Sequence, residues 1–259
     1  MLLAAGCEES STARSNTGIA SLSPALTSIV LGLGGAEEMV AVSNYDTDPL
    51  VGDLPRVGDF INVDWEELAK LRPATLLMQQ RNDDLDGRAK RLRIVPVSLP
   101  IDTLADIEAA VSEIAGLEAM QSTGHAANAA HDWRQRLRTS TPGDTRTLLV
   151  CGDRSLCAAG GTYLDELLTF AGGVNVLEGE GYLEPDDERV AALAPEVILV
   201  LLPEGDAISV RTRWERFGLV EIIERPDALV PGWNVVEIGE EMRERLSEVA
   251  PSPRDERAE

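Results

Sequence analysis

The chain has 259 residues, enough for two domains of ordinary size, and a hydrophobic content of 44% allows a sizeable core. Asp and Glu (45) outnumber Lys and Arg (23), and the net charge of −22 argues against nucleic acid or an anionic membrane surface as a partner. The apolar runs have strand length and are shorter than the roughly 20 residues that a membrane-spanning helix requires.

The amino terminus reads MLLAAGCEESSTARSNTG. A short apolar piece meets Gly6-Cys7, and a tract rich in Ser, Thr, Asn and Glu follows. This order is typical of the end of a lipoprotein signal, so we predict that residues 1–17 are a lipobox and polar tether and that Cys7 anchors an exported, periplasmic protein by lipid. An ordinary flexible cytosolic terminus is the alternative. At the other end, residues 251–259 are predicted to be a frayed tail.

Residues 18–101 alternate between helical patterns and short apolar strands. The stretches IASLS and MVAVS are expected strands, and between them a helix begins at Pro24 and ends before Gly34-Gly35. A loop rich in Asp, Pro and Gly follows, then the strand ATLLM, a charged helix over residues 83–93 and the strand IVPVSL. Such alternation predicts an α/β lobe with a parallel sheet.

Residues 102–140 contain no strand pattern. The stretches TLADIEAAVSEIAGLEAM and HAANAAHDWRQRLR have helical spacing and a high Ala content. We therefore predict a helical linker here, with one long helix that joins two lobes.

The α/β alternation restarts over residues 141–250. The strands TLLVC and LCAAG precede a helix over residues 162–170, and the helix TRWERFGLV, a late strand near ALV and a terminal helix over residues 240–249 complete this second lobe. Cys151 and Cys157 are interpreted as small buried residues of neighbouring strands. A disulfide between them is the alternative if the protein is exported.

One pattern occurs in both halves of the chain. It reads FINVDWEELAKLRPATLLM at residues 60–78 and YLEPDDERVAALAPEVILV at residues 182–200: an aromatic residue, then Asp, Glu and Pro at equal spacings, then an apolar strand. Asp64 and Asp186 are expected N-caps of two short helices. The proline ends each helix, because the residue before a proline avoids the α region.

Each short helix carries an exposed glutamate. Glu66 comes two residues before the inward Leu68, about 200° around the helix, and Glu188 stands in the same relation to Val190. Acidic residues in a first helical turn complement the helix dipole and need no partner. Their occurrence at the same place in both lobes nevertheless favours docking onto a two-fold symmetric partner that carries Arg.

The two aromatic residues of the repeat, Phe60 and Tyr182, each stand at the end of a loop. In parallel α/β lobes, ligands gather at loops that follow the carboxyl ends of strands. A flat ligand between two lobes would contact one aromatic ring from each side. The alternative is a ring that packs on its own lobe.

Taken together, these motifs resemble the periplasmic solute-binding proteins of ABC importers for vitamin B12, iron-siderophores and haem. The matching stretches are IASLSPALTSIVLGLGG, VAVSNYDTDP, LPRVGDFINVDWEELAKLRPATLLM, CAAGGTYLDELLTFAGGVNV and ERVAALAPEVILVL, and they cover about residues 18–202. Two features depart from the family pattern. Ser28 stands where an acidic residue is common, and DALVPGWNVVEIGEEM lacks the usual Arg-Pro-Gly-rich loop.

The resemblance implies a bilobal α/β periplasmic binding protein whose lobes are joined by one long helix and hold the ligand between them. It implies that Glu66 and Glu188 dock onto the permease. It also implies that Phe60, Tyr182 and Tyr45, in the loop NYDTDP, contact the ligand.

The resulting prediction is a monomeric substrate-binding component that captures a corrinoid and delivers it to an ABC permease dimer, with no cofactor and no metal of its own. The aromatic pair suits a large, flat, mostly neutral ring. An anionic iron-siderophore would need clustered Arg, for which Arg56 and Arg81 are the candidates, and haem would use Tyr45 or Tyr182 as an axial ligand.

An enzyme related to the tetrapyrrole chelatases is the alternative from another class, since these also have two α/β lobes. Such an enzyme needs a metal-handling His or acid in its cleft. His125 and His131 are six residues apart on the predicted linker helix and so lie on well-separated faces. The sequence shows no phosphate loop and no set of Ser, His and Asp for nucleophilic catalysis.

Overall fold

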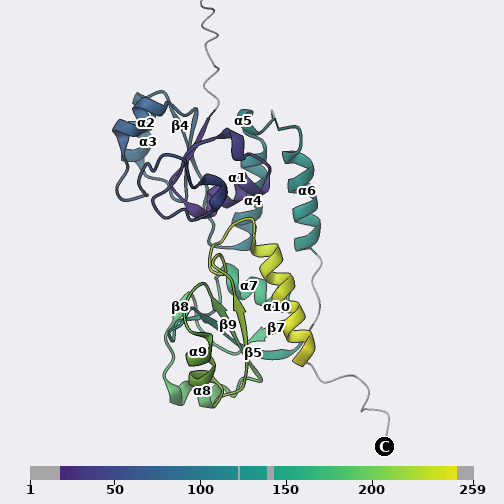
Figure 1. The fold of residues 1–259 in the computed structure, drawn as a ribbon. Coiled ribbons are helices and arrows are strands. Elements are labelled where there is room, and N and C mark those ends of the chain that lie inside the picture. The colour runs from purple at the N-terminus through teal and green to yellow at the C-terminus, as the bar shows by residue number, and fades with distance from the viewer. Residues whose placement is uncertain (1–17, 122, 139–142, 250–259) are drawn as a thin grey trace, which may run out of the picture.

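The structure, a computed structural model, describes residues 18–121, 123–138 and 143–249. Cys7 and the expected tail lie outside these ranges. Two β-sheets with their covering helices form two lobes at opposite ends of the molecule, with helices alongside the junction (Figure 1). The predicted α/β class with two parallel-sheet lobes is confirmed.

The N-terminal sheet has the strand order β2-β1-β3-β4, and every neighbouring pair is parallel. Its strands are β1 (Ile19–Ser21), β2 (Met39–Ala41), β3 (Thr75–Met78) and β4 (Val95–Ser98). Its helices are α1 (Pro24–Gly32), α2 (Trp65–Leu71) and α3 (Asp83–Arg91), with 3-10 turns η1 (Ala36–Glu38) and η2 (Pro49–Val51). Helix α1 begins as its sequence predicts, because Ser23 accepts a bond from the Leu26 amide and Pro24 occupies the first turn.

The C-terminal sheet has the order β10-β9-β5-β6-β8, with β7 also paired to β5. Strand β6 runs antiparallel to β5 and β8, whereas β7 and β9 run parallel to β5 and β10 runs parallel to β9. The strands are β5 (Thr145–Cys151), β6 (Cys157–Ala158), β7 (Gly173–Asn175), β8 (Tyr182–Leu183), β9 (Val197–Leu202) and β10 (Leu219–Glu224). The helices are α7 (Tyr163–Phe170), α8 (Asp187–Leu193), α9 (Ala207–Trp214) and α10 (Val235–Val249).

The expected late strand near ALV is wrong. Residues 228–230 lie in the turn between β10 and α10, and the last strand is β10, which includes residues assigned to a helix from the sequence. Strand β10 pairs with β9 along its whole length, from Leu219 opposite Val197 to Glu224 opposite Leu202. Pro226 and Pro231 bracket the ALV stretch, and proline lacks the amide that a central strand must donate.

The expected single long helix of the linker is also wrong in detail. The linker forms α4 (Leu104–Ala115), the short α5 (Glu118–Gln121) and α6 (Ala126–Leu137). Gly116 caps the end of α4, and Gly124, with φ of 67°, adopts the left-handed conformation before α6. The chain therefore turns back, and α6 packs against both α4 and α10 (Figure 1).

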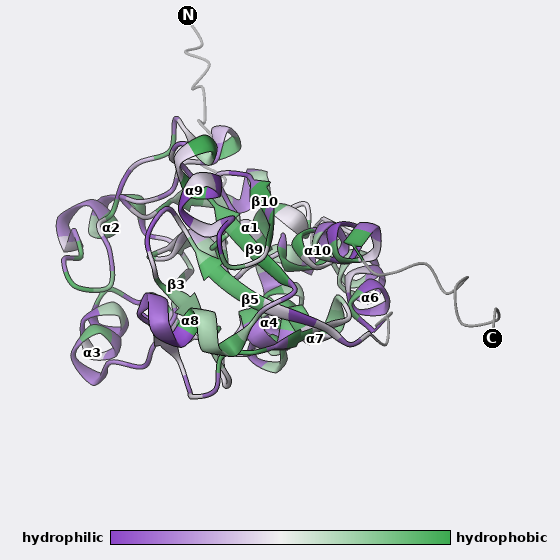
Figure 2. Cartoon of the chain, turned by 90° about the horizontal axis from the view of Figure 1, so that it is seen from below, coloured by the Kyte–Doolittle hydropathy of each residue, from purple (hydrophilic) through white to green (hydrophobic). Residues whose placement is uncertain are grey.

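One apolar cluster continues through both lobes. It includes Leu26 and Ile29 of α1, Ile107 of α4, Trp133 of α6, Leu167 of α7 and Met242 of α10. Smaller clusters fill the opposite face of each sheet. Figure 2 shows β5, β9 and β10 coloured as hydrophobic, whereas α3 at the periphery is largely hydrophilic. Because the largest cluster is shared, the lobes are held in place relative to each other by burial of common apolar area.

Trp233, in the segment between β10 and α10, makes a direct contact between the lobes. Its amide donates to Ser28 Oγ in α1 (3.1 Å), and its carbonyl accepts from Trp133 Nε1 (2.8 Å). Its ring lies 5.9 Å from the Trp133 ring, measured between centroids, and covers Gly32. The two departures from the family pattern, Ser28 and the segment that contains Trp233, therefore form a single contact.

Gly32 should be the sensitive position of this contact. A Cβ atom there would lie 2.1 Å from the Trp233 ring, so we expect Gly32→Ala to lower the free energy of unfolding by about 1–3 kcal/mol through overpacking. Gly87 in α3 is a matched control, because a Cβ there would meet nothing closer than an Arg91 nitrogen at 3.6 Å. Gly87→Ala should raise the free energy of unfolding by about 0.5–1 kcal/mol. Urea denaturation of both variants measures these shifts, and a shift of the same sign in both would contradict the contact.

Candidate ligand-binding site

A cavity of about 480 Å³ lies between the two lobes, and we call it the interlobe cleft. The N-terminal lobe contributes Gln79, which follows β3, and Ile101 and Asp102 precede α4. The C-terminal lobe contributes the start of α7 and the start of β8, and Pro231 lies at the same cavity. Gln79 is fixed by a bond from its Nε2 to Ser23 Oγ (2.6 Å), the residue that caps α1.

Tyr163 is the most buried aromatic residue of the interlobe cleft. As the first residue of α7 it follows the N-cap Thr162, and its amide donates to the Asp102 carbonyl (2.9 Å). The residue is 4% exposed, and its hydroxyl has no partner among the described residues. Burial, with smaller contributions from Tyr182 and Cys151, raises the pKa of Tyr163 far above that of a free phenol. A residue that lines the cleft therefore carries a buried, neutral donor without an acceptor.

Tyr182 borders the same cleft from the first position of β8. It is 46% exposed, so one part of the ring faces solvent and another part lies against the protein. Burial, followed by the influence of Cys151 and Asp102, raises the pKa of Tyr182 to about 12. Its phenol is consequently neutral at physiological pH. Tyr182 thus lines the interlobe cleft, and its contact with a ligand stays a prediction.

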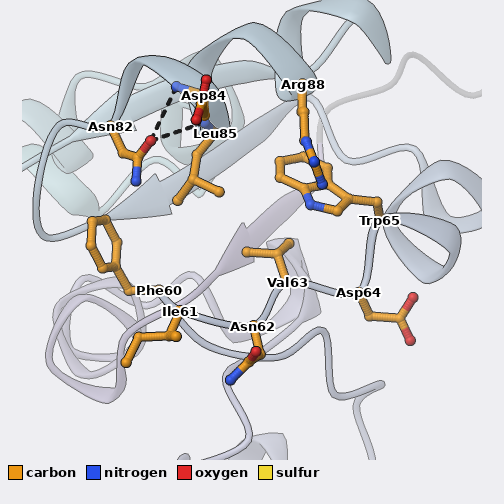
Figure 3. Close-up of a pocket in the computed structure, with 10 residues that line it drawn as sticks. All are labelled: Phe60, Ile61, Asn62, Val63, Asp64, Trp65, Asn82, Asp84, Leu85 and Arg88. Carbon is orange, nitrogen blue, oxygen red and sulfur yellow. Dashed lines mark hydrogen bonds between the residues drawn. The ribbon is translucent and has the colours of Figure 1, made fainter.

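Phe60 lies elsewhere. It borders a groove of about 770 Å³ that belongs entirely to the N-terminal lobe, together with Trp65, Leu85 and Arg88. Figure 3 shows the Phe60 ring extending toward Leu85 of α3, while the Arg88 guanidinium stands 5.9 Å from the centre of the Trp65 ring. The structure does not bring Phe60 and Tyr182 to one cavity.

Tyr45 follows β2 and is 68% exposed. It does not line the interlobe cleft, so of the three aromatic residues predicted from the sequence only Tyr182 does so. Tyr163, by contrast, was missed. It was visible in the stretch GGTYLDELL as the first helical residue after a capping Thr, but local sequence does not reveal which cavity a ring enters.

Glu66 and Glu188 occupy equivalent places in the two lobes. Each is the second residue of a seven-residue helix, α2 or α8, and each is exposed. The caps are equivalent too, because Asp64 accepts from the Glu67 amide (2.9 Å) and Asp186 from the Arg189 amide (2.8 Å). Helices α2 and α8 lie on the same side of the molecule, opposite α6 and α10 (Figure 1).

Both short helices end in the same unusual conformation. Arg72 (φ 50°) and Ala194 (φ 45°) are left-handed, and each precedes a proline. The repeat therefore extends to the backbone at the helix end. The residue before proline does avoid the right-handed α region, as expected, but it does so by the left-handed turn rather than by an extended one.

The charges around the interlobe cleft are few. Asp102 is the only carboxylate among its lining residues, and none of the described lining residues is Lys, Arg or His. Arg56 donates to the Ser43 carbonyl (3.0 Å), and Arg81 pairs with Asp83 at the surface (3.4 Å). Neither arginine candidate for an anionic ligand therefore lines the cleft.

His125 and His131 are both exposed, near and within α6, and the described residues contain no group of three His, Cys, Asp or Glu placed to hold a metal ion. Cys151 and Cys157 are free and buried in neighbouring strands, as the simpler interpretation predicted. Burial raises the pKa of each thiol to about 12, so neither is a reactive thiolate.

Two α/β lobes with a shared core and a cleft between the carboxyl ends of their strands define a bilobal solute-binding protein. The sequence agrees with this class. Residues 19–212 match the periplasmic binding protein family, and the chain belongs to that family.

Among curated proteins, the chain is similar to the vitamin B12-binding protein of Vibrio cholerae serotype O1, with 27% identity over 191 residues that span 70% of this chain and 68% of the relative. Among solved structures, the vitamin B12 binding protein BtuF of Vibrio cholerae has a TM-score of 0.73 at 21% identity, covering 90% of this chain and 98% of its own. The haem binding protein HutB of the same organism has a TM-score of 0.75 at 20% identity, covering 90% and 99%. These two similarities show the fold.

Family membership confirms the prediction of a binding protein rather than an enzyme. The chain is therefore a periplasmic binding protein by family, and its relatives support a periplasmic location. Within the described residues, every helix is too short or too polar to cross a bilayer.

The buried hydroxyl of Tyr163 can be tested without any ligand. Tyr163→Phe removes a polar atom that has no partner, so we expect the free energy of unfolding to rise by about 1 kcal/mol. The half-exposed Tyr182 is the control, since Tyr182→Phe should change stability by less than about 0.5 kcal/mol. Thermal and urea unfolding of the two variants provide the measurement. A loss of stability in Tyr163→Phe would reveal a partner for the hydroxyl.

Proposed function

We propose that this protein is the substrate-binding component of an ABC importer that captures a corrinoid of the vitamin B12 type and delivers it to a permease dimer. The observation that carries the proposal is the composition of the interlobe cleft. Two tyrosines, Gln79 and Asp102 line it, and no basic residue does. Such a lining suits a large ring with amide side chains and little net negative charge.

The same lining disfavours the other ligands of this class. Ferric siderophores and the propionate groups of haem are anionic, and anions are recognised through Arg and Lys. Iron ligation by Tyr also uses the phenolate, and burial holds the pKa of Tyr182 at about 12. Haem remains the second candidate, because a haem binding protein shares the fold at a TM-score of 0.75.

In the proposed complex, Tyr182 and Tyr163 contact the ligand from the C-terminal lobe. Tyr45 lies in the loop after β2, and Phe60 lies in the loop before α2. These two rings contact the ligand only if it is larger than the cleft and extends over both loops. The protein acts as a monomer. A lipid anchor at Cys7, outside the described residues, would keep it at the membrane, and a second acyl chain would be needed for stable attachment.

Titration with cyanocobalamin, haemin and a ferric siderophore, followed by calorimetry or fluorescence quenching, tests the ligand class. We expect saturable binding of cyanocobalamin and weaker binding of the two anionic ligands. Tyr182→Ala should weaken cyanocobalamin binding by about 1 kcal/mol, roughly fivefold, because a ring contact of ordinary strength is lost. Phe60→Ala is the informative companion: an unchanged affinity would confine the ligand to the interlobe cleft. Tighter binding of haemin than of cyanocobalamin would overturn the proposal of a corrinoid.

Glu66 and Glu188 are proposed as the docking groups for the permease. Equivalent, exposed carboxylates on one side of a two-lobed protein fit a dimer that offers the same Arg-bearing surface twice. The double variant Glu66→Arg with Glu188→Arg places like charges together, which costs several kcal/mol in association and slows the encounter.

Ligand affinity of that double variant should stay within about twofold of wild type, while transport with the cognate permease is lost. Glu113→Arg with Glu248→Arg is the matched control, because it makes the same charge change at exposed positions of α4 and α10. Transport that is equally impaired in both double variants would point to net charge rather than to docking at α2 and α8.

A further inference from the structure

A second cavity between the lobes, of about 400 Å³, is not explained by the proposed ligand site. It lies at the start of α1 and the loop after β2, and it is closed by the segment that joins β10 to α10, which reaches α1 in Figure 1. Val230 lines this cavity and Pro231 lines the interlobe cleft, so the chain passes between the two. We call the second cavity the acidic pocket; its polar lining includes Thr27, Asp46, Asp48, Asp227 and Asn234.

Asp46 is the buried carboxylate of the acidic pocket. It is 6% exposed, and its Oδ2 accepts from Thr27 Oγ1 (3.1 Å) and from the Ser43 amide (2.9 Å). Among the described residues, Oδ1 accepts no hydrogen bond. Burial raises the pKa of Asp46 even though both bonds and the nearby Arg56 act in the opposite direction. A cation beside this carboxyl would act against the effect of burial and lower its pKa.

Asn234 carries a buried acceptor without a donor. It is 7% exposed, and its Nδ2 donates to the Asp227 carbonyl (2.6 Å), which holds the side chain at the pocket. Its Oδ1 has no partner among the described residues. An unpaired buried acceptor lowers the free energy of unfolding, so a ligand that donates a hydrogen bond to this oxygen recovers that loss.

The remaining charges of the acidic pocket leave it electronegative. Asp227 accepts two bonds from Arg225 (2.6 and 2.8 Å), and this arginine also meets Glu237 at 3.3 Å. Asp48 accepts only from the Leu50 amide (2.8 Å). No Lys, Arg or His occurs among the described residues that line the pocket, whereas apolar walls are supplied by Pro24, Pro49, Pro226 and Val230.

We propose that the acidic pocket binds a small organic cation with a primary ammonium group on a short alkyl chain. The ammonium has three N–H donors and no acceptor, and it would donate to the free oxygens of Asp46 and Asn234. The alkyl chain would pack against the prolines. A metal ion fits less well, because the described residues include no group of three His, Cys, Asp or Glu placed to hold one.

The test compares a diamine with an uncharged molecule of the same shape. The full chain is titrated calorimetrically with 1,4-diaminobutane and, separately, with butane-1,4-diol. We expect saturable binding of one diamine per chain and no binding of the diol. This comparison uses the wild-type protein, so it does not depend on the folding of any variant. Equal binding of both compounds, or binding of neither, would overturn the proposal, as would saturable binding of Ca²⁺ in place of the diamine.

Asp46→Asn locates the site. The amide oxygen can still accept from Ser43 and Thr27, but the charge is gone, so diamine affinity should fall at least tenfold. Asp102→Asn makes the same change in the interlobe cleft and should leave diamine affinity unaltered. If Asp46→Asn bound the diamine with wild-type affinity, the diamine would bind elsewhere on the protein and the proposed site would be wrong.

Corrinoid binding separates this proposal from that of the interlobe cleft. Asp46→Asn should bind cyanocobalamin within about twofold of wild type, while Tyr182→Ala should lose corrinoid affinity and keep diamine affinity. A chain that binds the diamine but no corrinoid would reject the proposed importer ligand and leave the acidic pocket standing. Loss of cyanocobalamin binding in a folded Asp46→Asn would instead assign the pocket to the corrinoid site.

Discussion

The two lobes share one apolar core, and both candidate sites depend on that. Side chains of α1, α4, α6, α7 and α10 form a single buried cluster that crosses the junction. Each lobe alone would expose a large part of this cluster to water, which costs roughly 25 cal/mol per Å². The core therefore fixes the distance between the carboxyl ends of the two sheets. Cavities between those ends keep a defined shape for that reason.

Hydrogen bonds at the junction set the relative orientation of the two lobes, which apolar burial alone does not determine. The Tyr163 amide bonds to the Asp102 carbonyl, the Leu104 amide to Glu166 (2.6 Å), and the Trp233 amide to Ser28. Each bond joins segments far apart in the chain, and two of the three involve residues that line a cavity. The same backbone bonds that align the lobes thereby place Tyr163 at the interlobe cleft and the segment around Trp233 beside the acidic pocket.

Each of these cavities is lined by one residue with a buried polar atom that has no described partner. Tyr163 Oη at the cleft and Asn234 Oδ1 at the acidic pocket are both buried without a described partner. Such atoms lower the free energy of unfolding unless a ligand or a water molecule forms the missing hydrogen bond. The apolar core tolerates this cost because it is large and continuous. The two cavities also differ in charge, because one carboxylate lines the interlobe cleft whereas Asp46, Asp48 and Asp227 line the acidic pocket.

The sequence by itself determined the features that depend on neighbouring residues. The alternation of strands and helices, the helix start at Pro24, the caps Asp64 and Asp186, and the repeated helix with its exposed glutamate all follow from spacing and short-range bonds, and the structure contains each of them. The division into two parallel-sheet lobes followed as well, because two runs of α/β alternation flank a stretch without strands.

Only the tertiary structure decided which distant residues meet. Ser28 and Trp233 are 205 positions apart, and no local pattern pairs them. The turn at Gly116 and Gly124 that sends α6 back toward α10, the pairing of β10 with β9, and the separation of Phe60 from Tyr182 likewise depend on how whole elements pack. Long-range packing has no period along the chain. The cavities, which form where packing leaves space, were therefore beyond what the order of residues could show.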